Sequence, residues 1–217
     1  MRNYVLRELL KRAPEFAPQL IFDVGANIGQ SVAEFRDAYP DSMIMAFEPV
    51  PDAFSELQRV VEGDQRVQTF NYGLSRTAGE LTMTANGSST GNRVVDARGR
   101  TEGTISVPMM SGDQVCAEHD IDHLDFLKID AEGHDVEVLA GFSTMLRDQH
   151  IEYVQVEVSL SPRNLVHASF AQVSGYMTSF DYGLLGLYGL KRRMPRLGTR
   201  RGALFGDAVF VRDEVVA

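Results

Sequence analysis

An apolar run that leads straight into a glycine-bounded turn constrains the fold of this chain more than any other feature. The run Leu20-Ile21-Phe22 is followed by Asp23-Val24-Gly25-Ala26-Asn27-Ile28-Gly29-Gln30. This pattern predicts a buried strand, a turn and the first residues of a helix. Glycine has no Cβ, so the backbone of the turn can approach a bound ligand closely. Free amides at the helix N-terminus can bond an anionic group. The stretch therefore indicates a site for a nucleotide-like cofactor.

The next apolar run strengthens this interpretation. It covers Met43 to Phe47 and ends at Glu48. An acid at the tip of a second strand is well placed to accept hydrogen bonds from both hydroxyls of a ribose. The alternative is that Glu48 caps the following helix or pairs with a surface arginine. Together, the turn and the acid predict a cofactor pocket.

Apolar runs and helical patterns alternate along most of the chain. This alternation is typical of α/β proteins, in which helices cover both faces of a mostly parallel sheet. A chain of 217 residues is long enough for one domain with a sizeable core, and we expect residues 1–217 to form a single domain. The predicted helices are 1–13, 31–39, 51–61, 135–141 and 170–178, and the predicted strands are 20–22, 43–47, 66–71, 80–84, 125–130, 152–157, 180–187 and 208–212.

The middle of the chain has a different composition. Residues 73–104 are rich in Gly, Ser, Thr, Asn and Arg, which predicts a hairpin followed by a long loop. A loop of this length without its own structure is usually functional or disordered. We expect residues 85–104 to form a lid over the substrate, the alternative being a surface excursion. The basic segment 191–201 is predicted to be a loop, either solvated or in contact with an anionic substrate.

Charge and cysteine content limit the classes of partner. The net charge of -9 disfavours nonspecific binding to nucleic acid, which depends on neutralising phosphates. The lone Cys116 rules out an internal disulfide framework and fits a reducing compartment. No apolar run approaches the roughly 20 residues that span a bilayer, and the amphipathic segment 1–13 lacks the apolar core of a secretion signal. We expect a cytoplasmic protein that does not span a membrane. The number of subunits stays open, including a homo-oligomer.

Acids end four of the predicted strands: Asp23, Glu48, Asp130 and Glu157. Ligands of open parallel sheets sit beyond the carboxyl ends of the strands. Like charges that face one crevice raise each other's pKa, and a cation relieves the cost. That cation would be a metal ion or a positively charged cofactor. Oxygen ligands with few histidines favour magnesium or manganese over zinc. Alternatively, Glu157 pairs with Arg163.

Further candidate site residues lie near these acids. Glu132 follows Asp130 in the next turn, and His134 comes directly after it. Asp130 and Glu132 could instead cap the helix that follows, because acids favour helix starts. His134 is a candidate general base or a solvated residue at the helix start. Asn71 and Gly73 could cover a base or act only as turn residues.

Four segments resemble, in order and spacing, those of FkbM-type methyltransferases. They are Asp23 to Gly29, Phe47-Glu48-Pro49, Asn71-Tyr72-Gly73-Leu74-Ser75 and Leu127-Lys128-Ile129-Asp130-Ala131-Glu132-Gly133. The similarity extends from Ile21 to Glu157, and the Lys-Ile-Asp-x-Glu-Gly element is its most specific part. The resemblance implies the Rossmann-like class I fold, with a seven-stranded sheet, and S-adenosylmethionine (SAM) as cofactor.

The resemblance also implies roles for individual residues. The glycine loop would cradle the methionine part of SAM, the acid after the second strand would hold the ribose, and the Asn-x-Gly segment would lie near the adenine. The residues expected to bind the cofactor are Asp23, Gly25, Asn27, Gly29, Glu48, Asn71, Gly73 and Asp130. Related sugar O-methyltransferases hold a divalent cation on acids at strand ends. On that likeness Asp130, Glu157 and Glu132 would bind Mg²⁺.

The acceptors implied by the resemblance are hydroxyl groups of sugars or of polyketide-type natural products. We therefore expect an O-methyltransferase that acts on a small molecule or an oligosaccharide. Asp130 or His134 would take the hydroxyl proton, or a cation on Asp130 and Glu157 would acidify the hydroxyl. Two alternatives stay open. One is a nicotinamide-dependent oxidoreductase, against which the absence of G-x-G-x-x-G argues, and the other is a noncatalytic SAM-binding protein.

Overall fold

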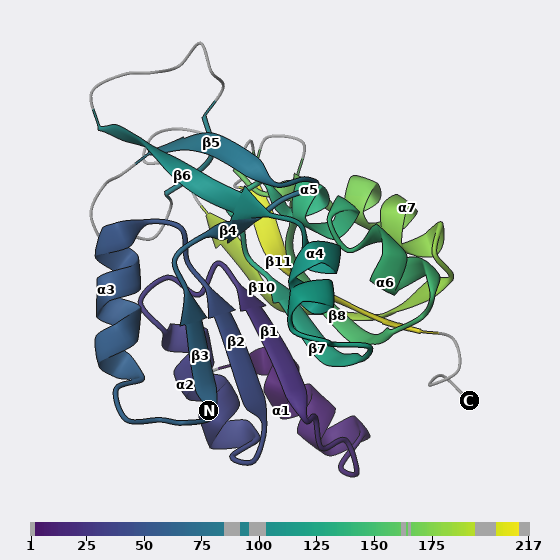
Figure 1. Ribbon diagram of the computed structural model, residues 1–217. Coiled ribbons are helices and arrows are strands. Elements are labelled where there is room, and N and C mark those ends of the chain that lie inside the picture. The colour runs from purple at the N-terminus through teal and green to yellow at the C-terminus, as the bar shows by residue number, and fades with distance from the viewer. Residues whose placement is uncertain are drawn as a thin grey trace.

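The fold is built around one twisted, mostly parallel sheet (Figure 1). The computed structural model describes residues 3–84, 92–95, 103–161, 164, 166–193 and 203–212. Seven strands follow one another across this sheet in the order β10-β11-β8-β7-β1-β2-β3, and a two-residue strand, β9, pairs with β8. The strands are β1 (Leu20–Val24), β2 (Met43–Phe47), β3 (Val67–Phe70), β7 (Leu124–Ile129), β8 (Ile151–Ser159), β9 (Ala168–Ser169), β10 (Tyr182–Arg193) and β11 (Ala203–Arg212). Only β11 runs antiparallel to its neighbours β8 and β10. The predicted fold class is confirmed.

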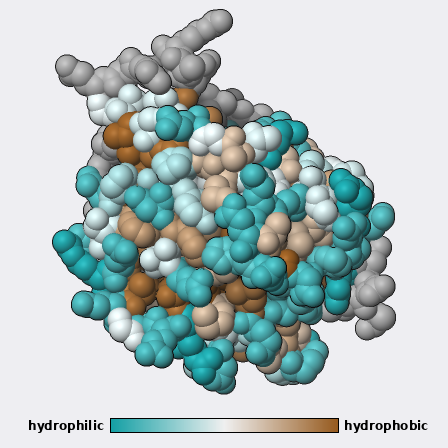
Figure 2. Space-filling model, in the orientation of Figure 1, coloured by the Kyte–Doolittle hydropathy of each residue, from teal (hydrophilic) through white to brown (hydrophobic). Residues whose placement is uncertain are grey.

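Helices cover both faces of this sheet, which explains why its strands are almost continuously apolar. Alternate residues of each strand enter different cores: Ile21 packs with α1, α2 and α3, whereas Phe22 packs with the helices of the opposite face. The helices are α1 (Tyr4–Arg12), α2 (Gln30–Ala38), α3 (Pro51–Val60), α4 (Gly112–Glu118), α5 (Asp135–Ala140), α6 (Ser143–Arg147) and α7 (Phe170–Thr178). Among the described residues, no helix has the length and apolarity needed to cross a bilayer. On the face seen in Figure 2, apolar side chains are scattered among hydrophilic ones.

A second, smaller sheet differs from the prediction. It has the order β4-β6-β5 and consists of β4 (Gly73–Leu74), β5 (Gly79–Thr84) and β6 (Thr104–Met110). The sequence analysis did not predict β6, which contains Pro108, a residue that argues against a strand. Thr104 was predicted to end the lid and instead begins this strand. Of the predicted lid, residues 85–91 and 96–102 lie outside the described residues. Val94 forms an antiparallel bridge with Met83.

The last two strands are also longer than predicted. Strands β10 and β11 pair in antiparallel fashion from Tyr182 with Arg212 to Arg193 with Ala203. The predicted loop at 191–201 is therefore wrong for Lys191–Arg193, which belong to β10. Basic residues suit that position because β10 is an edge strand of the sheet, where Lys is common. Residues 194–201 lie outside the described part of the chain.

Candidate active site

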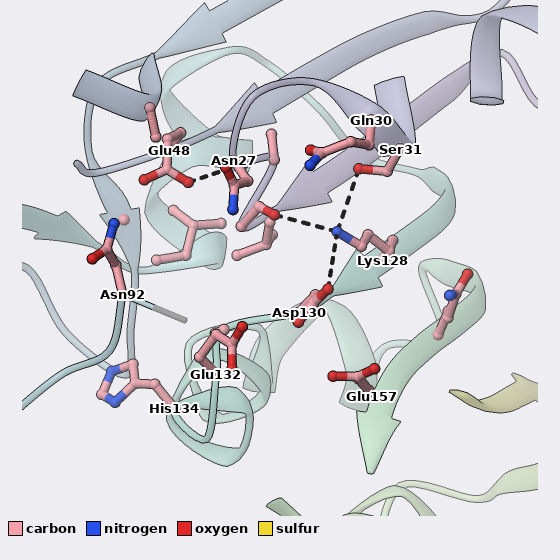
Figure 3. A pocket seen from close by; sticks show the side chains of 18 of the residues that line it. Asn27, Gln30, Ser31, Glu48, Asn92, Lys128, Asp130, Glu132, His134 and Glu157 are labelled. Atoms are coloured by element: carbon pink, nitrogen blue, oxygen red, sulfur yellow. Dashed lines mark hydrogen bonds and ion pairs between the residues drawn. The ribbon is translucent and has the colours of Figure 1, made fainter. Parts of the chain in front are cut away.

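A cavity of about 480 Å³ lies at the carboxyl ends of the central strands. Its volume falls in the range of about 300–1,000 Å³ that is usual for small-molecule sites. Figure 3 shows Glu48 and Asn27 toward one end, Glu157 toward the other, and Lys128 and Asp130 between them. The predicted site residues that line the cavity are Gly25, Asn27, Glu48, Gly73, Asp130, Glu132, His134 and Glu157, whereas Asp23, Gly29 and Asn71 do not line it.

The glycine turn brings backbone into the cavity wall. Gly25 has φ +78°, and a Cβ there would lie 2.0 Å from the carbonyl oxygen of Asp130. Gly29 caps α2 with φ +90°, and a Cβ there would crowd Leu57 and Val60 of α3. The first glycine therefore lets the turn after β1 pack against the end of β7, and the second lets α2 and α3 pack together. Asn27 lines the cavity, and its buried Oδ1 has no hydrogen-bond partner among the described residues. That oxygen could accept a hydrogen bond from a ligand.

Glu48 is held in one orientation at the end of β2. Its Oε2 accepts a hydrogen bond from the amide of Asn27 at 2.9 Å, and its Oε1 accepts one from the amide of Val50 at 2.8 Å. Burial raises the pKa of Glu48, although these two amides oppose the shift. Each carboxylate oxygen can accept a further hydrogen bond, so the group fits the paired hydroxyls of a ribose.

Asn71 acts on this loop from outside the cavity. Its Nδ2 donates to the carbonyl oxygens of Glu48 at 2.9 Å and Pro49 at 3.3 Å. Gly73 does line the cavity, and a Cβ there would meet the flexible end of Met109 at 2.7 Å. Proximity of either residue to an adenine stays a prediction. Apolar side chains form this end of the cavity: Ala53, Leu74, Met83 and Met109.

A buried ion pair lies beneath the turn. The Nζ of Lys128 lies 2.8 Å from Oδ1 of Asp23, whose residue is 0% exposed. Ser31 donates to the other oxygen of Asp23, and Lys128 also donates to the carbonyl oxygen of Gly25 at 3.3 Å. Burial opposes the charged form of Lys128, but the carboxylates of Asp23 and Asp130 raise its pKa, so it carries an ammonium. Asp23 thus anchors the turn and does not line the cavity.

Lys128 is a residue that the sequence analysis did not assign to the site. Its Nζ lies 3.9 Å from Oδ2 of Asp130, as the dashed line in Figure 3 shows. The sequence contained one signal, a lysine inside an otherwise apolar strand. A buried lysine needs an anionic partner, so this position indicated an ion pair. The partner becomes visible only when β1 and β7 pair, which places Asp23 opposite Lys128.

Acidic groups gather at the other end of the cavity. Burial, followed by the carboxylates of Asp130 and Asp207, raises the pKa of Glu157 to about 8. Oε2 of Glu157 lies 3.0 Å from Nδ1 of His167. Burial also raises the pKa of Asp207, whose Oδ1 accepts a hydrogen bond from Gln155 at 2.8 Å. A positively charged ligand placed here would relieve the repulsion between these acids.

The three predicted magnesium ligands do not form a metal-binding cluster. In the described residues, only His123, Asp125 and Glu152 bring three ligand atoms within 4.8 Å of one another, and they lie at the beginnings of β7 and β8, away from the cavity. Asp130 is instead matched by Lys128 and Glu157 by His167. Carboxylates are suitable ligands for Mg²⁺, but the arrangement of these three does not fit the ion.

His134 lies in the cavity wall on the same side as Asn92, away from Glu157 (Figure 3). Its Nε2 is 2.9 Å from Oγ of Ser75, and burial lowers the pKa of the imidazole. The turn that presents His134 is fixed by Asp135, which accepts hydrogen bonds from the amides of Ala131 and Gly133. At neutral pH His134 is therefore an uncharged ring that can accept a proton. Its role as a general base stays a prediction.

The fold and the cavity define a Rossmann-like α/β protein of the class I methyltransferase type. A solved structure with this fold is the N-methyltransferase NodS from Bradyrhizobium japonicum in complex with S-adenosyl-L-homocysteine. It is 8% identical, the match covers 96% of this chain and 86% of that chain, and the TM-score is 0.53. At this level of identity the likeness establishes the fold alone.

The family follows from the sequence comparison. The chain belongs to the methyltransferase FkbM domain family, which it matches over residues 23–184. It is 29% identical to the hexuronic acid methyltransferase AglP of Haloferax volcanii over 82% of this chain and 72% of that protein. It is also 32% identical to methyltransferase 1 of Beauveria bassiana over 67% of each chain. The predicted family is confirmed, and the chain is a methyltransferase by family.

Proposed function

We propose that the protein is a SAM-dependent O-methyltransferase that acts on a hydroxyl of a sugar, a glycoside or a related natural product. The observation that carries this proposal is the layout of the cavity. An apolar end with the Glu48 carboxylate continues into an acidic end with Asp130 and Glu157. SAM has the same order of groups: an apolar base, a ribose diol and a cationic sulfonium.

The residues present fit SAM at each of these groups. Glu48 has free acceptor capacity for the ribose hydroxyls, and the orphaned Oδ1 of Asn27 can accept a further hydrogen bond. Asp130 follows β7 at the centre of the cavity, where its carboxylate would face the sulfonium. When bound, SAM supplies an activated methyl group on a positively charged sulfur. The protein has to supply position and a place for one proton.

The acceptor hydroxyl is a poor nucleophile until its proton is removed or shared. We assign this task to His134, because its uncharged imidazole lines the cavity and is oriented by Ser75. We assign Asp130 to positioning the sulfonium, since its carboxylate lies at the centre of the cavity, 3.9 Å from Nζ of Lys128. The relative from Haloferax volcanii carries the name of a hexuronic acid methyltransferase, which supports a sugar as the acceptor.

The test joins a substrate screen with one conservative variant. Candidate hydroxylated acceptors are incubated with SAM, with magnesium or with a chelator, and products heavier by one methyl group are sought by mass spectrometry. Calorimetric titration with SAM and with NAD separates this proposal from an oxidoreductase. A protein that binds SAM but methylates no acceptor would support the noncatalytic alternative.

Asp130→Asn should lower turnover about a hundredfold or more, because it removes the charge nearest the sulfonium. SAM affinity should change much less, since Glu48 and the glycine turn are untouched. Asp122→Asn is the matched control, because Asp122 is exposed and does not line the cavity. Equal losses of turnover and SAM affinity in Asp130→Asn would contradict the assignment of Asp130 to the reacting centre.

A further inference from the structure

The proposed cofactor accounts for only part of the cavity. The cavity is also lined by residues of β8, β10, β11 and α1, namely Gln155, Gly189, Lys191, Asp207 and Tyr4. Glu48, the acid proposed to bind the ribose, follows β2, and Asp130, the acid proposed to face the sulfonium, follows β7. The part beyond β7 is therefore the space left for the acceptor. This inference rests on the proposed function.

Gln155 is the unexplained residue of this part. It is 4% exposed and stands opposite Lys128 in the pairing of β8 with β7. Its Nε2 donates to Oδ1 of Asp207 at 2.8 Å. This bond fixes the orientation of the amide, because a carboxylate oxygen accepts from the amide nitrogen and not from the amide oxygen. The Oε1 of Gln155 is thereby directed away from Asp207, and it is buried with no hydrogen-bond partner among the described residues.

The space beside this pair is kept open by a glycine. Gly189 has φ +57° and lies at an irregularity in the pairing of β10 with β11. A Cβ there would lie 3.3 Å from Oδ2 of Asp207 and 3.3 Å from the ring of Tyr4. A ligand in this part of the cavity would therefore meet hydrogen-bond acceptors on the sheet and an aromatic ring on α1.

The chemistry of this part selects against charged acceptors. Gln155 Oε1 calls for a hydrogen-bond donor, and a further carboxylate beside Asp207 and Glu157 would be disfavoured, because burial and neighbouring acids already raise the pKa of both groups. The cation in this part of the wall, Lys191, lies 5.7 Å from the ring of Phe205 and lowers the pKa of both acids. The two acids thus offset part of its charge. A hydroxyl supplies a donor without adding charge.

We propose that Gln155, held by Asp207, is a specificity-determining residue that accepts a hydrogen bond from a second hydroxyl of the acceptor. The acceptor is then an uncharged, polyhydroxylated ring in which a hydroxyl other than the methylated one is read by Oε1. A site built around a buried polar group discriminates strongly against an analogue that lacks the partner group. The protein therefore recognises the sugar through a hydroxyl other than the one that is methylated.

The experiment measures binding of defined probes to the intact protein saturated with S-adenosyl-L-homocysteine. The probes are the methyl glycosides of glucose, galactose, mannose and rhamnose, their monodeoxy analogues, methyl glucuronide and methyl glucosaminide. Their binding is measured by saturation-transfer NMR and calorimetry. We expect a neutral glycoside to bind, and one of its deoxy analogues to bind about tenfold more weakly, as loss of one hydrogen bond predicts.

Gln155→Met should weaken binding of the neutral glycoside about tenfold and abolish the difference between it and the deoxy analogue. Asp207→Asn is the second variant, because it frees the amide of Gln155 to rotate. It should weaken binding of the glycoside although Oε1 is still present. Gln172→Met is the matched control, since Gln172 is exposed on α7. Thermal melting with bound S-adenosyl-L-homocysteine shows that each variant is folded.

Three results would overturn the proposal. One is equal glycoside binding by Gln155→Met and the parent protein. Another is a loss of SAM affinity in Gln155→Met, which would give Oε1 to the cofactor. The third is a failure of the neutral glycosides to bind, including the case in which only the glucuronide or the glucosaminide binds. SAM binding by the parent protein is measured separately, so failure of the proposed function is distinguished from failure of this inference.

Discussion

Replacing Lys128 by methionine tests the buried ion pair that holds the glycine turn. The substitution keeps the length of the side chain but removes the ammonium that lies 2.8 Å from Asp23. Asp23 is 0% exposed, so its carboxylate would remain buried with Ser31 as its hydrogen-bond donor. Removing one partner of a buried ion pair costs about 3–5 kcal/mol. Because whole domains are stable by only about 5–15 kcal/mol, this is a large loss.

The assay is urea unfolding, supported by thermal melting. For a chain of this length, a loss of about 4 kcal/mol should lower Tm by roughly 10 °C. The double variant Asp23→Asn/Lys128→Met removes both charges and should recover most of the loss, because no unpaired charge stays buried. Arg59→Met is the control, since Arg59 pairs with Glu56 on the surface and should change stability by less than about 1 kcal/mol.

The reasoning fails if Lys128→Met loses no more stability than Arg59→Met. It fails equally if the double variant is as unstable as the single one, because the loss would then come from packing and not from an unpaired carboxylate.

Three further predictions concern the cavity. Gly25→Ala should abolish SAM binding and lower Tm, because the new Cβ would lie 2.0 Å from the carbonyl oxygen of Asp130 at a positive φ. Glu48→Gln should weaken SAM binding about 10- to 100-fold in calorimetry, the range for losing a charged hydrogen bond. Its Tm should hardly change, because burial already disfavours the carboxylate. Burial lowers the pKa of His134. The stability that the neutral imidazole contributes is therefore present above pH 6.5 and is lost as the pH falls through the lowered pKa. His134→Gln should therefore lose less stability than the parent protein between pH 7 and pH 5 in urea unfolding, and should lack the acid limb of the turnover profile.

The edge of the sheet where the site lies could be predicted because a short pattern encodes it. An apolar run that ends in an acid marks both a buried strand and a polar group at its carboxyl end, and Glu48, Asp130 and Glu157 were found in this way. Lys128 and Gln155 stand within such runs, and their roles depend on the neighbours that strand pairing brings opposite them. Pairing of β1 with β7 joins Asp23 to Lys128, over a separation of 105 residues. No local pattern contains that information.

Strand β6 of the second sheet was missed for a different reason. Pro108 interrupts the alternation of β6, although the strand pairs with β5 on one side and β4 on the other. The helix that follows, α4, was not predicted either, although it carries a recognisable signal. Ser111 and Gln114 form a capping box in which the Ser111 side chain accepts from the amide of Gln114. The spacing Ser-x-x-Gln is a signature of a helix N-terminus that can be found in the sequence alone.

The clustering of acids at one end of the cavity is energetically unfavourable in the absence of a ligand. The proposed cofactor would offset that cost. Burial, Asp130 and Asp207 together raise the pKa of Glu157, because an ionised carboxylate is disfavoured among buried acids. A sulfonium beside Asp130 would lower that cost. Transfer of the methyl group would leave an uncharged sulfur, so these acids would interact less favourably with S-adenosyl-L-homocysteine than with SAM. One arrangement of acidic groups would thus favour cofactor binding before the transfer and product release after it.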